Sequence, residues 1–250
     1  MDSHITVPKC VLKQFALDKD GFYKYNVQTK IISRGYPRTT FTQEGYFSKS
    51  MEIMLSDEVE TPLNKLFKFV KQFDVFDLPS IIPAKISEIA VNYVKALIAR
   101  SPMLFDSAKK ESIFLQFMTE QEQHDIIVYY AIQEEKMDEI FDRFDLSFMI
   151  NETDTPFVLP IRGVYEYRIN NVLCMNIPLN PTCSLMFKEK GKQIHRDNKN
   201  IEIMFIPKGY DDIAKKLNGF AFQRQKQDGN GYVVCNKKMV LEELIKSKGN

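Results

Sequence analysis

Three side chains in the first hundred residues have the chemistry for acid–base work on a phosphate group. His4 carries an imidazole, which titrates near neutral pH and can act as a general base or bind a metal ion. Glu52 offers a carboxylate near the start of a long helical pattern. Arg100 stands two residues before Pro102, where its guanidinium could bind a phosphate through paired hydrogen bonds. These residues predict a catalytic site formed by His4, Glu52 and Arg100.

Further carboxylates follow Glu52 at Asp57, Glu58 and Glu60. The eight-residue spacing places Glu52 and Glu60 on roughly one helix face, with Glu58 off that face. Such a cluster could hold Mg²⁺ or Mn²⁺, which would activate water for phosphodiester hydrolysis. The same residues also fit a solvated first turn whose charges complement the helix dipole.

The other candidates have structural alternatives as well. His4 could hydrogen-bond the first helix, and Arg100 could satisfy the last carbonyls of its own helix. A basic stretch over residues 188–199 could bind a nucleic-acid backbone, or could form a solvated loop between strands. The residues that would contact the nucleic acid are Lys188, Lys190, Lys192 and Arg196.

Composition narrows the class of protein. The 250 residues contain 34 Lys and Arg against 33 Asp and Glu, so no global charge attracts nucleic acid or an anionic membrane. The first residues lack the pattern of a signal peptide, and the apolar run over 126–132 is too short to span a bilayer. Four scattered cysteines fit reduced thiols better than a zinc site. These features predict a cytoplasmic protein without a membrane partner.

The spacing of hydrophobic residues changes along the chain, and it separates the helices from the strands that must position these groups. A helix is expected after Pro8, and residues 21–26 and 30–33 predict a hairpin. Helical spacing then covers 48–143, with a final helix from Glu120 to Arg143. Two apolar stripes are expected in this region: Leu63, Leu66, Phe67, Val70 and Phe73, and Ile86, Ile89, Tyr93, Ala96 and Leu97. Alternation afterwards predicts strands at 157–159, 164–168, 172–177, 184–187 and 201–206, and helices near 210–217 and 238–246.

This order predicts an α+β fold with an N-terminal helix and hairpin, a central helical bundle and a C-terminal, mostly antiparallel sheet with short helices. Because no Gly/Ser linker interrupts the chain, residues 1–250 are expected to form a single compact domain. Its subregions would be 1–47, 48–145 and 146–250. Phosphate-loop, dinucleotide-binding, zinc-protease and α/β-hydrolase motifs are absent from the sequence.

Six short motifs occur in order along most of the chain. They are His4-x-x-x-Pro8-x-x-x-Leu12-x-x-Phe15, Gly21-Phe22-Tyr23-Lys24-Tyr25, Met51-Glu52-x-x-Leu55-Ser56, Ala99-Arg100-Ser101-Pro102, Asn151-x-Thr153-x-Thr155-Pro156-Phe157 and Ile177-Pro178-Leu179-Asn180-Pro181-x-x-x-Leu185. The series resembles the bacterial domain-of-unknown-function family 4238. That family usually continues the fifth motif as Ile-Thr-Ser-Asp-Asn-Pro, whereas here Val158-Leu159-Pro160 follows and the aspartate is missing.

The resemblance implies an intracellular bacterial or phage effector of the kind found in phage defence. With the carboxylates and the basic stretch, it favours a nuclease, a phosphodiester hydrolase acting on RNA or DNA. The alternative is a non-catalytic sensor or protein-interaction module. The expected partners are nucleic acid, further copies of the chain, or a component of a defence complex.

Overall fold

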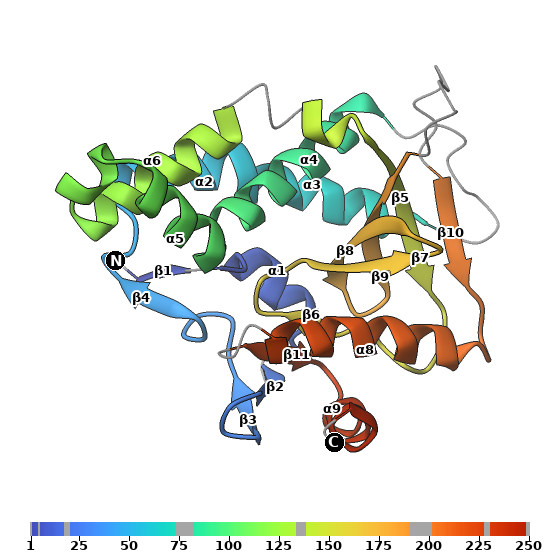
Figure 1. Cartoon of the computed structure of the whole chain (residues 1–250). Coiled ribbons are helices and arrows are strands. Elements are labelled where there is room, and N and C mark those ends of the chain that lie inside the picture. Colours follow the sequence, from blue (N-terminus) through green and yellow to red (C-terminus); the bar gives the residue numbers. More distant parts are fainter. Residues whose placement is uncertain are drawn as a thin grey trace. The chain divides into compact units, whose positions relative to one another are not determined.

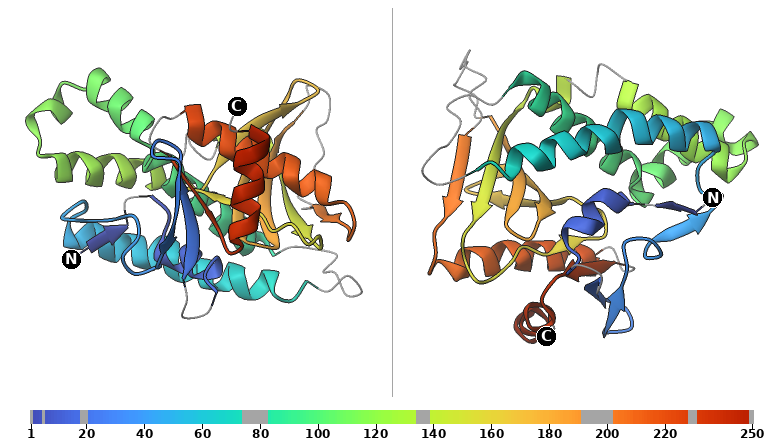
Figure 2. Two further views of the ribbon diagram at one scale, coloured as in Figure 1. Left: turned by 90° about the horizontal axis from the view of Figure 1, so that it is seen from below. Right: turned by 180° about the vertical axis from the view of Figure 1, so that it is seen from behind.

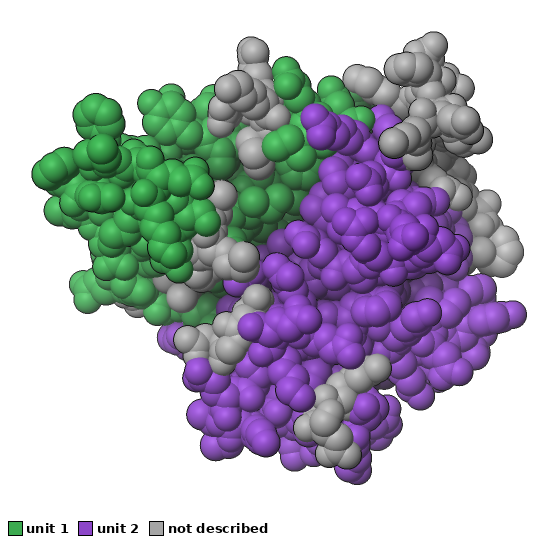
Figure 3. Space-filling view, in the orientation of Figure 1, with its two compact units in different colours: residues 1–10, 41–142 green, residues 11–40, 143–250 purple. Residues whose placement is uncertain are grey.

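The computed structural model describes residues 2–4, 6–17, 21–73, 83–133, 139–190, 202–227 and 231–248. Contacts group the chain into two compact units, each built from segments far apart in sequence (Figure 3). Unit 1 contains residues 1–10 and 41–142, and unit 2 contains residues 11–40 and 143–250. The mixture of helices with largely antiparallel sheets confirms the predicted α+β class. The single compact domain expected for 1–250 stays a prediction.

Unit 1 combines a small antiparallel pair of strands with a set of helices (Figure 1). The pair is β1 (Asp2–His4) with β4 (Thr42–Glu44), and the helices are α2 (Lys49–Leu55), the π-helical turn η2 (Ser56–Glu60), α3 (Thr61–Val70), α4 (Ala84–Ala99), α5 (Pro102–Glu111), the 3₁₀ turn η3 (Phe114–Phe117) and α6 (Glu120–Gln133). The predicted apolar stripe over 86–97 is buried, and the one over 63–73 is buried as far as Val70, because each covers one helix face; Phe73 lies beyond α3 and is half-buried.

Strand β1 was not predicted, since three residues are too few to show alternation. It pairs with β4 over three residue pairs, from Asp2 with Glu44 to His4 with Thr42. The buried Ser3 hydroxyl accepts a hydrogen bond from the Phe47 backbone N–H at 3.4 Å. The pairing therefore gives His4 a defined place next to the helices of unit 1.

Unit 2 contains two sheets. The five-stranded sheet has the order β10-β5-β9-β8-β7, and only its β10–β5 pair is parallel. Its strands are β5 (Phe144–Asn151), β7 (Tyr165–Ile169), β8 (Val172–Asn180), β9 (Cys183–Glu189) and β10 (Glu202–Ile206). The four-stranded sheet has the order β3-β2-β11-β6, with β2 (Phe22–Asn26), β3 (Ile31–Gly35), β6 (Leu159–Pro160) and β11 (Tyr232–Cys235).

The predicted hairpin is confirmed as β2 and β3, and the Asn26 side chain stabilises its turn by accepting from the backbone N–H groups of Gln28 and Thr29. Strand β11 pairs with β2, so the hairpin joins the C-terminal part of the chain (Figure 2). The helices of unit 2 include α8 (Asp211–Gln227) and α9 (Lys238–Lys248); α1 (Lys9–Gln14) follows Pro8 as expected and crosses the unit boundary. Helix α8 runs ten residues beyond its predicted end.

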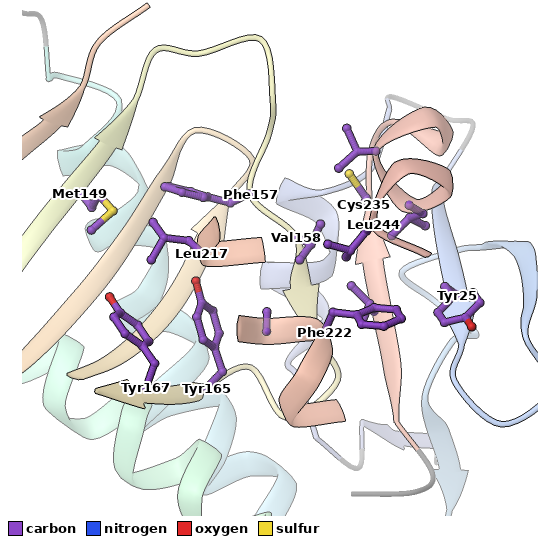
Figure 4. Packing of buried hydrophobic residues seen from close by; sticks show 14 of the residues in the cluster. Tyr25, Met149, Phe157, Val158, Tyr165, Tyr167, Leu217, Phe222, Cys235 and Leu244 are labelled. Atoms are coloured by element: carbon purple, nitrogen blue, oxygen red, sulfur yellow. The ribbon is translucent and has the colours of Figure 1, made fainter. Parts of the chain in front are cut away.

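The core of unit 2 lies where both sheets meet α8 and α9, and Figure 4 shows its side chains. Tyr25 stacks on Phe222 with ring centroids 5.6 Å apart. Asn218, only 1% exposed, places its amide between two backbone groups of the segment before β6. It accepts from the Val158 N–H at 3.0 Å and donates to the Pro156 carbonyl at 2.9 Å. This polar clasp fixes the segment against α8.

Two expectations about compartment can be compared with the structure. Among the described residues, no helix is both long and apolar enough to cross a membrane. Burial raises the pKa of the thiols of Cys174, Cys183 and Cys235, so these side chains stay protonated at neutral pH.

Candidate functional site

The three predicted catalytic residues all belong to unit 1. His4 ends β1, Glu52 lies in α2, and Arg100 is the residue that follows the last turn of α4. Burial lowers the pKa of both His4 and Arg100; the charge of Arg100 lowers that of His4 further, whereas the charges of Glu60 and Glu52 raise that of Arg100. The structure thus places the three groups in one electrostatic neighbourhood, although they come from distant parts of the sequence.

Arg100 is a buried cation, with 4% of its surface exposed. Its Nη1 donates to the Thr6 carbonyl at 3.0 Å, and the guanidinium carbon lies 5.5 Å from the centre of the Phe47 ring. Its Nε is buried without a hydrogen-bond partner, and no described carboxylate forms an ion pair with it. Burial lowers the pKa of Arg100, but the guanidinium stays charged at neutral pH. Taking a cation out of water costs on the order of several kcal/mol, and the negative charges of Glu60 and Glu52 offset part of that cost for Arg100.

His4 is the second group with an unused polar atom. Its Nδ1 is buried and has no hydrogen-bond partner among the described residues. Burial, followed by the charges of Arg100 and Lys9, lowers the pKa of His4 to about 4. The imidazole is therefore neutral at physiological pH, and a neutral imidazole can accept a proton or coordinate a metal.

The π-helical turn η2 decides how the carboxylates are arranged. Thr61 donates its backbone N–H to the Ser56 carbonyl, five residues earlier, which widens this turn. An α-turn takes about 3.6 residues and the wider turn about one more, so eight residues complete about two turns. Glu52 and Glu60 therefore lie on the same side of the helix, more closely aligned than regular α-helix would place them.

Glu60 is the more enclosed of these two carboxyl groups. Burial raises its pKa, the charge of Glu52 raises it further, and the charges of Arg100 and Lys9 lower it. Glu58 instead accepts a hydrogen bond from the Gln133 side chain at 2.9 Å on an exposed part of the surface. The expected separation of Glu58 from the other two glutamates is thus consistent with its contacts.

Two further residues near Arg100 carry unpaired polar atoms. Tyr93, a fully buried residue of α4, has a hydroxyl without a hydrogen-bond partner among the residues that the structure describes, and so does the Thr6 side chain. Tyr93 and Arg100 influence each other's pKa, and Thr6 contacts Arg100 directly. We call the four atoms the unpaired cluster: Arg100 Nε, His4 Nδ1, Thr6 Oγ1 and Tyr93 Oη.

Tyr93 and Thr6 are site residues that the sequence pattern does not predict. The predicted apolar stripe of α4 includes Tyr93, and the burial of that residue confirms the stripe. The available signal was a single phenol in an otherwise aliphatic buried face, since a buried tyrosine hydroxyl usually needs a partner. Thr6 gives no such signal.

The described side chains supply only part of the predicted Mg²⁺ or Mn²⁺ site. Within the described ranges, no group of three or more His, Cys, Asp or Glu side chains is placed to hold a metal ion. Glu52 and Glu60 remain as two carboxylates on one side of a helix. Magnesium is commonly held by one or two carboxylates together with substrate phosphates.

The predicted nucleic-acid-binding residues fall in unit 2 or outside the described residues. Lys188 lies in β9 and Lys190 directly follows it, and both side chains are exposed. Lys192 and Arg196 lie outside the described residues. A nucleic-acid contact at this stretch stays a prediction.

The fifth sequence motif forms a hydrogen-bonded loop in unit 2. Asn151 donates to the Thr155 carbonyl at 2.8 Å and accepts from the Thr153 hydroxyl at 2.7 Å. Asp211 accepts from both the backbone and the hydroxyl of Thr155, which lowers the pKa of that carboxyl. These polar groups bind one another, so the motif acts as a structural clasp here.

The low pKa of His4 predicts that acid destabilises unit 1. Between pH 6.5 and about 4 the unfolded chain binds a proton at His4 that the folded chain does not. This contribution to stability is present above pH 6.5 and is lost as the pH falls through about 4. In urea titrations at fixed ionic strength, wild type should therefore lose stability more steeply between pH 7 and 4.5 than His4→Gln. An equal slope for both proteins would contradict the burial of a neutral imidazole.

Comparison with known proteins adds no relative to this description. No protein-family model, no curated protein and no solved structure matches the chain. Membership of the bacterial family that the six motifs resemble therefore stays a prediction.

Proposed function

We propose that unit 1 hydrolyses phosphodiester bonds of RNA or DNA. The observation that carries the proposal is the buried Arg100, whose guanidinium has an unpaired Nε and no carboxylate in contact among the described residues. A buried arginine with an unpaired donor favours binding of an external anion. Phosphate suits this role because the planar guanidinium can donate two parallel hydrogen bonds to its oxygens. The neutral imidazole of His4 in the same neighbourhood supplies a base.

The proposed step balances as a hydrolysis. Arg100 binds the phosphate oxygens and stabilises the charge that builds on them. The oxygen of a water molecule bonds to phosphorus while His4 accepts one of its protons. The bond from phosphorus to the leaving oxygen breaks, its electron pair stays on that oxygen, and protonated Glu60 donates the proton. The products are a phosphate monoester and a free hydroxyl group.

The two glutamates would have different roles in this step. Burial raises the pKa of Glu60, which is the direction that a general acid needs. Glu52 raises that pKa through its negative charge and so acts as a positioning residue. Where Mg²⁺ or Mn²⁺ takes part, the same two carboxylates are the groups that would hold it, together with the substrate phosphate.

The wider role in this proposal is that of a cytoplasmic bacterial or phage effector in phage defence. It rests on the six ordered motifs and their family resemblance. Nucleic acid is then the partner of the site, and an oligomer or a defence complex would be its setting.

The test uses labelled RNA and DNA, with and without Mg²⁺ or Mn²⁺. Wild type should cleave at least one substrate, and His4→Ala should lose about 100-fold or more, the usual effect of removing a general base. Glu60→Gln should lose activity, whereas Glu58→Gln, whose side chain bonds the exposed Gln133, is the matched control and should keep it. No cleavage by wild type, or equal cleavage by His4→Ala, would reject the proposal.

A specific contact also supports the non-catalytic alternative. The bond from Arg100 to the Thr6 carbonyl and the pairing of β1 with β4 both hold the N-terminal segment within unit 1. A protein-interaction module could use these contacts only as a clasp. It would bind its partner unchanged after His4→Ala and would show no cleavage.

A further inference from the structure

The unpaired cluster is unusual because several buried polar atoms lack partners in one neighbourhood. Buried polar groups in native proteins are nearly always hydrogen-bonded, so each exception calls for an explanation. Arg100 and Tyr93 are both more than nine-tenths buried, and both keep an unused donor. Thr6 adds a hydroxyl that can also donate. The Arg100 guanidinium and the hydroxyls of Tyr93 and Thr6 can all donate hydrogen bonds. Such a set of donors suits an anion with several oxygen atoms.

The charges near the cluster restrict the charge of that anion. Arg100 and Lys9 are positive and Glu52 is negative, while His4 is neutral. Glu60 adds a second negative charge whenever it is ionised. The neighbourhood therefore holds at most about one excess positive charge. The desolvation cost of an ion grows steeply with its charge, so this site can accommodate one negative charge better than two.

We propose that Arg100 Nε, Tyr93 Oη and Thr6 Oγ1 are the donors that bind the singly charged phosphate of an internal phosphodiester linkage. This inference rests on the proposed function and narrows its substrate class to cleavage within a strand. A terminal phosphate carries about −1.5 to −2 charges at neutral pH and is the substrate class that the site rejects. His4 Nδ1 is then the remaining atom of the unpaired cluster and is the base of the proposed step.

Access to the donors requires a local movement, because all the atoms of the unpaired cluster are shielded from solvent. The segment that carries two of the four atoms begins with β1, which has only three residue pairs with β4. A strand this short opens easily compared with the helices of unit 1. Phosphate binding would give these atoms the partners that they lack.

The test measures binding of two small probes to the intact protein at pH 7.5 by ³¹P NMR titration. Dimethyl phosphate carries one charge and represents an internal linkage, whereas methyl phosphate represents a terminal one. Dimethyl phosphate should bind wild type about tenfold more tightly. Tighter binding of methyl phosphate, or no binding of either probe, would overturn the inference.

A second variant tests the role of the tyrosine. Tyr93→Phe should weaken dimethyl phosphate binding about 10- to 100-fold, the effect of losing a hydrogen bond to a charged group. Its melting temperature should not fall, because the hydroxyl has no described partner to lose. Tyr129→Phe, the same change at a half-exposed position of unit 1, is the matched control and should bind as wild type does. Unchanged binding by Tyr93→Phe would overturn the assignment of this donor.

The binding assay and the cleavage assay test the two proposals independently. Selective binding of dimethyl phosphate without cleavage of RNA or DNA would reject hydrolysis and keep the phosphodiester site. Cleavage by a protein that prefers methyl phosphate would keep hydrolysis and reject the internal linkage as substrate.

Discussion

Replacing Arg100 by methionine is expected to remove phosphate binding and cleavage while leaving the free energy of unfolding unchanged or higher. Methionine has a similar length and no charge, so the variant no longer buries a cation that lacks a carboxylate in direct contact among the described residues. Replacing buried charges by apolar side chains of similar volume is often neutral or stabilising by about 1–4 kcal/mol. The variant loses the bond to the Thr6 carbonyl, which offsets part of this gain.

A lower free energy of unfolding for Arg100→Met would indicate that Arg100 mainly holds the N-terminal segment in place. If the contact with Thr6 were its main role, methionine would leave that carbonyl without a partner and would cost about 1–3 kcal/mol. Urea titration gives the stability, and the nuclease and ³¹P assays give the function. Arg100→Lys is the matched control, because it keeps the charge but lacks the planar pair of donors and should also lose binding.

Replacing Asn218 by leucine is expected to cause the largest loss of stability. The side chains have similar volumes, but leucine can neither accept from Val158 nor donate to Pro156. Both backbone groups would then lie buried without partners, at about 1–3 kcal/mol each. We expect the free energy of unfolding of unit 2 to fall by about 2–6 kcal/mol in urea titrations.

Asn180→Leu provides the comparison within the same unit. Asn180 also makes two hydrogen bonds, to the backbone and hydroxyl of Thr182, but these lie at an exposed position. Water can replace them, so the loss should stay below about 1 kcal/mol. Equal losses of stability for the two variants would show that burial does not increase the contribution of the Asn218 hydrogen bonds.

The helical half of the fold was predictable because its signal is local. The stripes over α3 and α4 repeat at helical spacing, and their burial follows from that spacing. Strand β5 was missed because the preceding helical pattern continued toward it, and β11 because four residues give little alternation. Helix α8 was predicted too short, since its second half is rich in polar residues although Asn218 and Gln225 are buried.

The candidate site was predictable only in part. His4, Glu52 and Arg100 have the residue types for acid–base and phosphate chemistry, and the structure places them in one unit. The alignment of Glu52 with Glu60 depends on a single wide turn, which leaves no mark in the residue pattern. The lack of partners for Arg100 Nε and Tyr93 Oη is a property of the packed interior, which residue types and spacing do not determine.

The pairing of β2 with β11 has a consequence for synthesis on the ribosome. Strand β2 ends at Asn26, and its partner Tyr232 is made roughly 200 residues later. At about 5–20 residues per second, the hairpin waits roughly 10–40 s for that strand. During this interval the edge of β2 that carries Tyr25, a buried residue in the finished protein, has no β11 to pair with. The nascent chain therefore carries an unpaired strand edge with Tyr23 and Tyr25 for most of its translation.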